Sequence, residues 1–222
     1  RVSYAPSINN AKLDDFLLHA DLKSDLSKFS FISGRDTNTC NVLKELVNSD
    51  VSLVVDPTLL HTEEFYRSRE VLPSDENYIL IYSYGSTLNK KNIERILKLK
   101  EATGCKIISL GNYLKFADKN VYCSENEFLG YFSKAKYVIT DTFHGTMFST
   151  IYRKPTTIFV RSAGKLSATV DLFHMEKLVT AEEKDLVEYF NQNDFPKIWE
   201  EVYSFVDEYR QNSIDYLNSA LS

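Results

Sequence analysis

Residues 78–110 read YILIYSYGSTLNKKNIERILKLKEATGCKIISL, and this segment indicates the fold class most clearly. An apolar run at Tyr78–Tyr82 predicts a buried strand, and a second run at Cys105–Leu110 predicts another. Between them Asn89 is a typical helix N-cap, an apolar stripe at helical spacing follows it, and Gly104 fits the residue after a helix end. A strand, a helix and a strand in this order predict a parallel pair, because parallel neighbours need a long crossover connection.

The same alternation continues on both sides of this stretch. Downstream, Ser124 and Glu127 form a capping box that opens a helix. Further strands are expected at 137–140 and 156–160, with helices at 144–152, 168–174 and 182–189 and a long amphipathic helix at 195–221. Upstream, a strand at 28–33, a helix from residue 36 or 37 to 47 and a strand at 51–55 repeat the pattern. Alternating strands and helices of this length predict an α/β fold with parallel sheets.

Domain ranges follow from this alternation. We expect residues 1–76 to form the last part of a first Rossmann-like domain together with a linker. Residues 77–192 form a second Rossmann-like domain, and residues 193–222 form a terminal amphipathic helix. The chain begins at Arg1 with residues that already read as structure, so we expect the first domain to be incomplete here.

Composition narrows the classes of function. The net charge of −5 argues against a nucleic-acid partner, which a basic surface usually marks. The longest apolar stretches are too short to cross a bilayer, so no transmembrane segment is expected. Three widely spaced cysteines and isolated histidines show no metal-ligand spacing, and no metal site is predicted. With no secretory signal pattern, a cytoplasmic location is expected.

Polar residues fall where the predicted strands end. In parallel sheets ligands bind beyond the carboxyl ends of the strands. Arg35 and Asp56 follow upstream strands, and Asp141 and His144 follow the strand at 137–140. A histidine in the first turn of a helix can bind a phosphate or act as an acid or base. The neighbouring candidates for substrate binding are Thr142, Gly145, Thr146, Arg161 and Lys165, with Gly145 expected to let a ligand approach the backbone.

Each of these residues also has a purely structural interpretation, and spacing does not exclude it. Asp141 could cap the following helix while His144 is a surface residue. Arg35 could be a solvated arginine in a turn. Asp56 could cap a turn at Pro57.

Six short segments, in order, resemble the polysaccharide pyruvyl transferase family. They are Ser3–Ser7, Ser33–Asp36, Asp56–Leu60, Tyr78–Tyr82, Ser124–Phe128 and Val138–Ser149, the last with its Asp-Thr-Phe-His-Gly block. The resemblance implies a two-domain glycosyltransferase-B-like fold with the site in the cleft between the domains. It implies transfer of a pyruvyl group from phosphoenolpyruvate to a sugar of a surface polysaccharide, such as a capsule or exopolysaccharide, forming a ketal across two hydroxyls.

The resemblance also implies roles for individual residues. His144 and Asp141 become catalytic candidates, and Arg35 becomes an anion-binding candidate. No cofactor is implied beyond the donor substrate, phosphoenolpyruvate. Family members often carry an arginine where this chain has Thr169, and Arg161 or Lys165 could supply the charge instead.

Two other functions remain open at this stage. A nucleotide-sugar glycosyltransferase would have the same architecture, and a non-catalytic polysaccharide-assembly homologue would explain Thr169. The acceptor is expected to be a sugar or a lipid-linked oligosaccharide, which would place the protein at the inner face of the membrane. The terminal helix could also mediate formation of a homo-oligomer.

Overall fold

The computed structural model describes residues 1–47, 49–160 and 164–222, and the chain divides into two compact units. Unit 1 consists of Arg1–Leu60, Ala163–Phe173 and Tyr203–Ser222. Unit 2 consists of His61–Ser162 and His174–Val202.

Unit 2 contains a five-stranded parallel sheet. Its strands are β3 (Tyr78–Tyr82), β4 (Lys106–Leu110), β5 (Lys119–Val121), β6 (Tyr137–Thr140) and β7 (Thr156–Ile158). The spatial order is β5-β4-β3-β6-β7, so β3 lies at the centre. Leu80 on β3 is paired with Ile108 on β4 and with Val138 on β6. The four residues 78–81 have no exposed surface, which explains why β3 reads as an uninterrupted apolar run.

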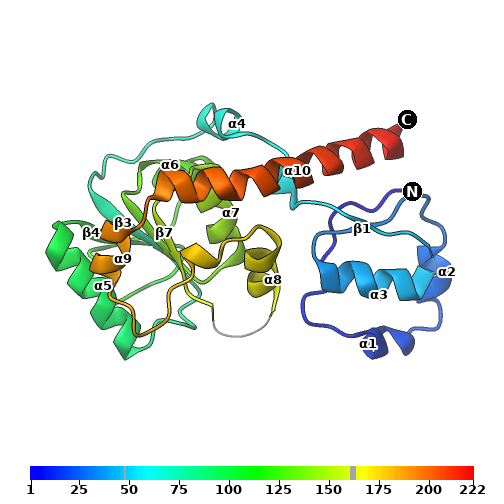
Figure 1. The fold of residues 1–222 in the computed structure, drawn as a ribbon, viewed down its shortest axis with the longest axis horizontal. Helices are drawn as coiled ribbons and strands as arrows, with labels where there is room; N and C mark the ends of the chain where they lie inside the picture. Colours follow the sequence, from blue (N-terminus) through cyan, green and yellow to red (C-terminus); the bar gives the residue numbers. More distant parts are fainter. Residues whose placement is uncertain (48, 161–163) are drawn as a thin grey trace. The chain divides into compact units, whose positions relative to one another are not determined.

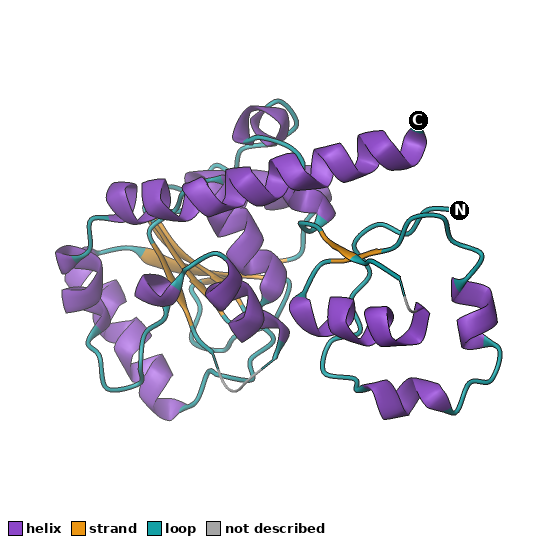
Figure 2. Cartoon of the chain, turned by 45° about the vertical axis from the view of Figure 1, so that its right-hand side comes forward, coloured by secondary structure: helices purple, strands orange, loops and turns teal. Residues whose placement is uncertain are grey.

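Helices cover both faces of this sheet, as Figures 1 and 2 show. The helix α5 (Lys90–Thr103) contacts α9 (Leu186–Gln192), and α6 (Glu125–Lys134) contacts α7 (Phe143–Ile151) and α4 (Glu63–Arg67). The short 3-10 helix η2 (Glu176–Leu178) follows β7 in the unit. Two predicted caps are confirmed: Asn89 accepts from Asn92 N at the start of α5, and Ser124 with Glu127 forms the capping box of α6. Gly104 ends α5 with φ of 65°, as predicted.

Unit 1 contains a small parallel pair, β1 (Ser33–Gly34) and β2 (Ser52–Leu53), joined by α3 (Thr37–Val47). Ile32, Cys40, Leu43 and Val51 form its buried core. The remaining elements of the unit are α1 (Leu13–Leu17), α2 (Leu22–Leu26), the 3-10 helix η1 (Pro57–Leu59), α8 (Lys165–Leu172) and the last part of α10 (Phe195–Leu221).

Side chains of α10 hold the loops of unit 1 in place. Ser213 Oγ accepts from Val55 N at 2.8 Å, and Tyr216 donates to Ser3 O at 2.7 Å. Arg210 Nε donates to Leu59 O at 2.6 Å. The predicted terminal helix is therefore confirmed as a helix, and its second half is part of a folded unit.

The two upstream strand predictions need correction, and one strand of the five-stranded sheet was not predicted. The strand expected at 28–33 is limited to Ser33–Gly34 plus a single bridge between Val2 and Phe31. Lys28 N and Phe29 N instead donate to the last turn of α2, so they cannot join a ladder. The strand at 51–55 is likewise reduced to Ser52–Leu53. The short polar strand β5 lies at the sheet edge and carries no apolar run, so the sequence pattern missed it.

The two units do not follow the predicted domain ranges. Residues 61–76 belong to unit 2, because Arg67 Nη1 donates to Ser133 Oγ at 3.1 Å and Val71 N donates to Asn126 O at 2.9 Å. The helix α10 begins in unit 2 and ends in unit 1, and α8 also belongs to unit 1. Contacts between residues far apart in sequence decide these memberships.

Candidate functional site

Three segments of the chain converge in unit 1 around the end of β1. Ser33 Oγ donates to Ser3 O at 2.7 Å and accepts from Ala5 N at 3.1 Å. Arg35 N donates to Pro6 O at 3.2 Å, and Val54 N donates to Gly34 O at 2.9 Å. Hydrogen bonds therefore join the segments 3–7, 33–36 and 54–56. Arg35 comes directly after β1, the strand in the second of these segments.

Arg35 forms an ion pair with Asp56. Both residues were singled out in the sequence because they follow predicted strands. Nη1 of Arg35 contacts Oδ2 of Asp56, whose side chain is only 3% exposed. The other carboxylate oxygen accepts from Thr58 N at 3.0 Å and from Thr58 Oγ1 at 2.8 Å, so Asp56 also caps η1. The arginine side chain is 21% exposed and still reaches solvent. The capping interpretation of Asp56 is confirmed, and the same carboxylate orients Arg35.

Lys165 begins α8 and adds a second cation to unit 1. Burial and, to a smaller extent, the nearby Arg35 lower the pKa of Lys165 to about 8, although Asp56 and Asp36 act in the opposite direction. The lysine lines a cavity of about 410 Å³ together with Asp36 and residues of the 9–12 segment. Two candidate anion-binding residues, Arg35 and Lys165, thus interact electrostatically within one unit.

Asp36, which the sequence indicated only as a possible cap of the helix ending at residue 47, also lines this cavity. Its Oδ1 accepts from Thr39 N at 2.8 Å and from Thr39 Oγ1 at 2.7 Å. The side chain is buried, and its Oδ2 has no hydrogen-bond partner among the described residues. Thr169, in contrast, is buried and donates to Lys165 O at 2.8 Å, which is a contact within α8.

The candidates between Asp141 and Thr146 lie in unit 2, after the carboxyl end of β6, which is paired with β3. The chain leaves β3 toward β4 and β5 and returns to the other side of β3 at β6, so this edge is the topological switch point. Asp141 follows β6 there and accepts four hydrogen bonds from the loop after β3. The donors are Tyr84 N at 3.1 Å, Ser86 Oγ at 3.1 Å, Thr87 N at 3.3 Å and Thr87 Oγ1 at 2.9 Å. Asp141 therefore fixes this loop, and a direct part in the chemistry stays a prediction.

Thr142, rather than Asp141, caps α7. Thr142 Oγ1 accepts from Gly145 N at 2.9 Å, and Thr142 O accepts from Thr146 Oγ1 at 3.1 Å. All three residues are buried. A Cβ on Gly145 would lie 2.0 Å from Thr140 Oγ1, so glycine is needed there for packing of α7 on β6. Packing is thus a reason for glycine at this position, and the approach of a ligand to Gly145 stays a prediction.

His144 has an exposed side chain at the second position of α7. Its ring lies edge-on to the ring of Phe143, with centroids 5.2 Å apart. The location in the first turn of a helix, which made His144 a candidate, is confirmed by the structure. Its catalytic role stays a prediction, and the candidate Arg161 lies outside the described residues.

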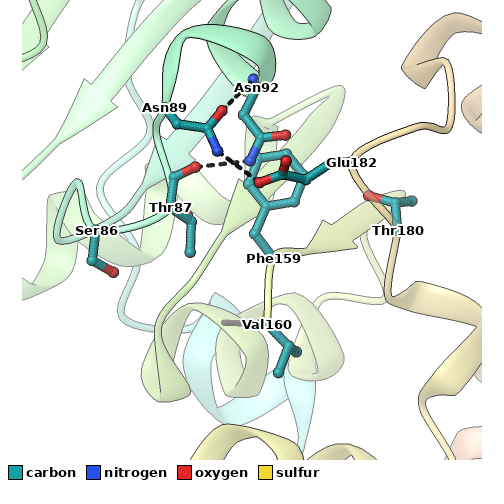
Figure 3. Close-up of a pocket in the computed structure, with 8 residues that line it drawn as sticks. All are labelled: Ser86, Thr87, Asn89, Asn92, Phe159, Val160, Thr180 and Glu182. Carbon is teal, nitrogen blue, oxygen red and sulfur yellow. Dashed lines mark hydrogen bonds between the residues drawn. The ribbon is translucent and has the colours of Figure 1, made fainter. Parts of the chain in front are cut away.

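A cavity of about 330 Å³ lies at the N-terminus of α5, and Figure 3 shows its lining. The residues lining it are Ser86, Thr87, Asn89, Asn92, Phe159, Val160, Thr180 and Glu182. From the sequence, Asn89 was predicted only as a helix cap, and the other lining residues were not predicted to form a site. The hydroxyl-rich Ser-Tyr-Gly-Ser-Thr run at 83–87, which follows a strand, is the signal that could have indicated them.

Metal-binding clusters and membrane-spanning helices are both absent from the described ranges. These ranges contain no group of three or more His, Cys, Asp or Glu side chains placed to hold a metal ion. None of the helices in those ranges combines the length and the hydropathy that crossing a bilayer requires.

Solved structures with a similar fold include two UDP-GlcNAc 2-epimerases. The enzyme from Neisseria meningitidis bound to UDP-GlcNAc is 12% identical with a TM-score of 0.59, over 94% of this chain and 67% of that chain. The enzyme from Methanocaldococcus jannaschii in complex with UDP-GlcNAc and UDP is 14% identical with a TM-score of 0.47, over 82% and 56%. This chain thus spans between about half and two thirds of their lengths. At such identity the first likeness shows the fold alone, and it confirms a Rossmann-like α/β fold of the glycosyltransferase-B type.

Sequence comparison identifies the family. No curated protein sequence matches the chain. The family model described as polysaccharide pyruvyl transferase matches residues 1–162, which is well over half of the 222 residues and includes Arg35, Asp141 and His144. The chain belongs to the polysaccharide pyruvyl transferase family.

Proposed function

We propose that the protein transfers a pyruvyl group from phosphoenolpyruvate to a sugar of a surface polysaccharide, such as a capsule or exopolysaccharide, forming a ketal. The family match over residues 1–162 carries this proposal. The hydrogen bonds that join segments 3–7, 33–36 and 54–56 in unit 1 support it, because they present Arg35 at the end of a parallel strand.

The donor has two anionic groups, and unit 1 supplies two cations. A guanidinium binds a phosphate or carboxylate through a planar fork, and Arg35 is held by Asp56 on one side while its side chain still reaches solvent. Lys165 adds an ammonium group in the same electrostatic environment. We assign the binding of the phosphoenolpyruvate phosphate and carboxylate to these two residues.

Ketal formation balances without a redox step. One sugar hydroxyl and then a second form C–O bonds to the central carbon of the pyruvyl group, and the bond to the phosphate oxygen breaks. Of the two hydroxyl protons, one ends on the methylene carbon, which becomes a methyl group, and the other leaves with inorganic phosphate. A group that holds and releases protons near neutral pH suits both transfers, and His144 is our candidate for it.

Binding of phosphoenolpyruvate to the whole chain tests the donor assignment. Thermal shift and calorimetric titration should show binding by the wild type, and Lys165→Met and Arg35→Lys should weaken it about tenfold or more, as expected for the loss of a charge-assisted hydrogen bond. Lys44→Met, an exposed lysine of α3 in the same unit, is the control and should bind as the wild type does. Equal binding by all variants would remove unit 1 as the donor site.

Phosphate release in the presence of candidate glycans tests the reaction. His144→Ala should lower the rate about 10²–10⁴-fold with little change in donor affinity, as positioned acids and bases typically do. His19→Ala, an exposed histidine outside the candidate site, should leave the rate unchanged. Donor binding without release for every glycan would favour the non-catalytic homologue, for which the buried Thr169 in α8 is the specific observation.

A further inference from the structure

We infer that the 330 Å³ cavity at the N-terminus of α5 is a subsite for a neutral polyol, the acceptor sugar of the proposed reaction. This inference rests on the proposed function for the identity of the ligand as acceptor. The cavity is an observation that does not depend on that function, and its described lining residues all belong to unit 2. Its volume is at the lower end of the range of about 300–1,000 Å³ for small-molecule sites, which suits one sugar ring.

Two hydroxyl groups of the cavity, those of Ser86 and Thr87, have a fixed direction. Ser86 Oγ and Thr87 Oγ1 both donate to Asp141 Oδ2, at 3.1 and 2.9 Å. A hydroxyl has one proton and two lone pairs, so both oxygens can only accept from a ligand. Asp141 thereby makes this side of the cavity a set of acceptors, which match the O–H donors of a sugar.

Glu182 is the second acceptor group of the cavity, and Figure 3 shows how it is held. Asn89 Nδ2 donates to Glu182 Oε1 at 2.6 Å, and Asn89 Oδ1 accepts from Asn92 N at 2.9 Å. One carboxylate oxygen is thus fixed by the N-cap of a long helix, while the carboxylate retains lone pairs for a ligand. Two adjacent sugar hydroxyls can donate to such a carboxylate together, and hydrogen bonds to a charged group are stronger than neutral ones.

Arg95 donates hydrogen bonds to two residues that line the cavity, Asn92 and Thr180. Its Nη1 donates to Asn92 Oδ1 at 2.6 Å, and its Nη2 donates to Thr180 Oγ1 at 3.4 Å. Nε donates to Lys184 O at 2.8 Å, so all three nitrogens of the guanidinium have protein partners. Asn92 Nδ2 in turn donates to Thr87 O at 2.8 Å. A site whose groups are held in this way loses little entropy on binding.

The charged group of this cavity disfavours an anion. Among the described lining residues none is a lysine or arginine, and the charged one is Glu182. A phosphate or carboxylate would meet a like charge and hydroxyl oxygens whose protons are already donated to Asp141. The charge pattern therefore separates this cavity from the cationic pair Arg35 and Lys165, and it favours the neutral substrate over the donor.

Ligand-observed NMR with the whole chain tests the subsite directly. The probes are methyl glycosides of glucose, galactose, mannose, N-acetylglucosamine and N-acetylmannosamine, each titrated without phosphoenolpyruvate. At least one should bind, and Glu182→Gln should weaken it about tenfold or more. Glu183→Gln is the matched control, because this neighbouring glutamate is exposed, pairs with Lys91 and does not line the cavity. Ser86→Ala gives a second, milder variant on the opposite side.

The outcomes separate this inference from the proposed function. Binding of no glycoside, equal effects of Glu182→Gln and Glu183→Gln, or displacement of the sugar by inorganic phosphate would each overturn the subsite. Sugar binding that depends on Glu182 in a protein that does not bind phosphoenolpyruvate would keep the subsite and contradict the proposed donor. Phosphoenolpyruvate binding that depends on Arg35, in a protein that binds none of the glycosides, would support the proposed donor and contradict the sugar subsite.

Discussion

Thr87 Oγ1 donates a hydrogen bond of 2.9 Å to Asp141 Oδ2, and this bond joins the loop after β3 to the loop after β6. The two residues are 54 positions apart in the sequence and meet at the switch point of the sheet. The bond orients the Thr87 hydroxyl, which lines the proposed sugar subsite, and it assigns Asp141 a structural task that its position next to His144 does not suggest.

Asp141→Asn should disturb both the stability and the subsite. An amide offers one acceptor oxygen in place of two, so donors of the 84–87 loop lose their partner. We expect a loss of about 1–3 kcal/mol in the free energy of unfolding, measured by urea denaturation, together with weaker sugar binding. Glu94→Gln, an exposed residue of α5, is the control and should change stability by less than about 0.5 kcal/mol. An unchanged unfolding midpoint would show that Asp141 does not hold the loop.

Gly145→Ala should destabilise the protein through packing. The added Cβ would lie 2.0 Å from Thr140 Oγ1 and 2.6 Å from Thr142 Oγ1, so α7 must shift away from β6. Such overpacking costs typically about 1–3 kcal/mol and here we expect the upper end. Gly104→Ala is the comparison, because no atom lies within 4 Å and only the positive φ of 65° opposes it. Thermal unfolding should show the larger loss for Gly145, and the opposite order would contradict the packing argument.

Arg35→Ala should lower the free energy of unfolding, because Asp56 would lose the cation with which it is paired. The Asp56 side chain is 3% exposed and would keep a buried carboxylate without its cation. Breaking a buried pair from one side costs about 3–5 kcal/mol, whereas the double variant Arg35→Ala/Asp56→Asn should recover part of this. A double-mutant cycle in urea measures the coupling. Additive single effects would mean that the pair contributes nothing beyond its separate side chains.

Lys165 makes anion binding in unit 1 depend on pH. The pKa of Lys165 is lowered from 10.5 to about 8, so its positive charge disappears as the pH rises through about 8. Affinity for phosphoenolpyruvate should therefore fall between about pH 7 and 9. Lys165→Arg should remove this fall, since a guanidinium stays charged, and Lys165→Met should bind weakly at every pH. A fall of the same size in all three proteins would assign it to another group.

The lowered pKa of Lys165 also makes the free energy of unfolding depend on pH. Because the pKa is lowered in the folded state, the unfolded chain binds more protons between about pH 8 and 10.5. The contribution of Lys165 to stability is unfavourable below this window and is relieved as the pH rises through it. As the pH rises through this window, the unfolding free energy of the wild type should therefore increase relative to that of Lys165→Met.

Much of unit 2 could be predicted from the sequence because its signals are local. The apolar run at 78–82, the cap Asn89, the αL residue Gly104 and the Ser124–Glu127 capping box each act within a few residues, and the structure confirms them. Unit 1 was harder, since its strands contain two residues each, and the segments at Ser3 and Val55 beside them are held by hydrogen bonds from α10, far along the chain.

Strand ends and short motifs visible along the chain are enough to predict the α/β alternation, the family and the candidates Arg35, Asp141, His144 and Lys165. What these side chains contact is visible only in the folded protein. Folding paired Arg35 with Asp56, placed Lys165 in their electrostatic field and directed the hydroxyls of Ser86 and Thr87 toward Asp141. The physical reason is that hydrogen bonds and charges depend on distance in space, and folding brings together groups that are about 20 to 130 positions apart in sequence.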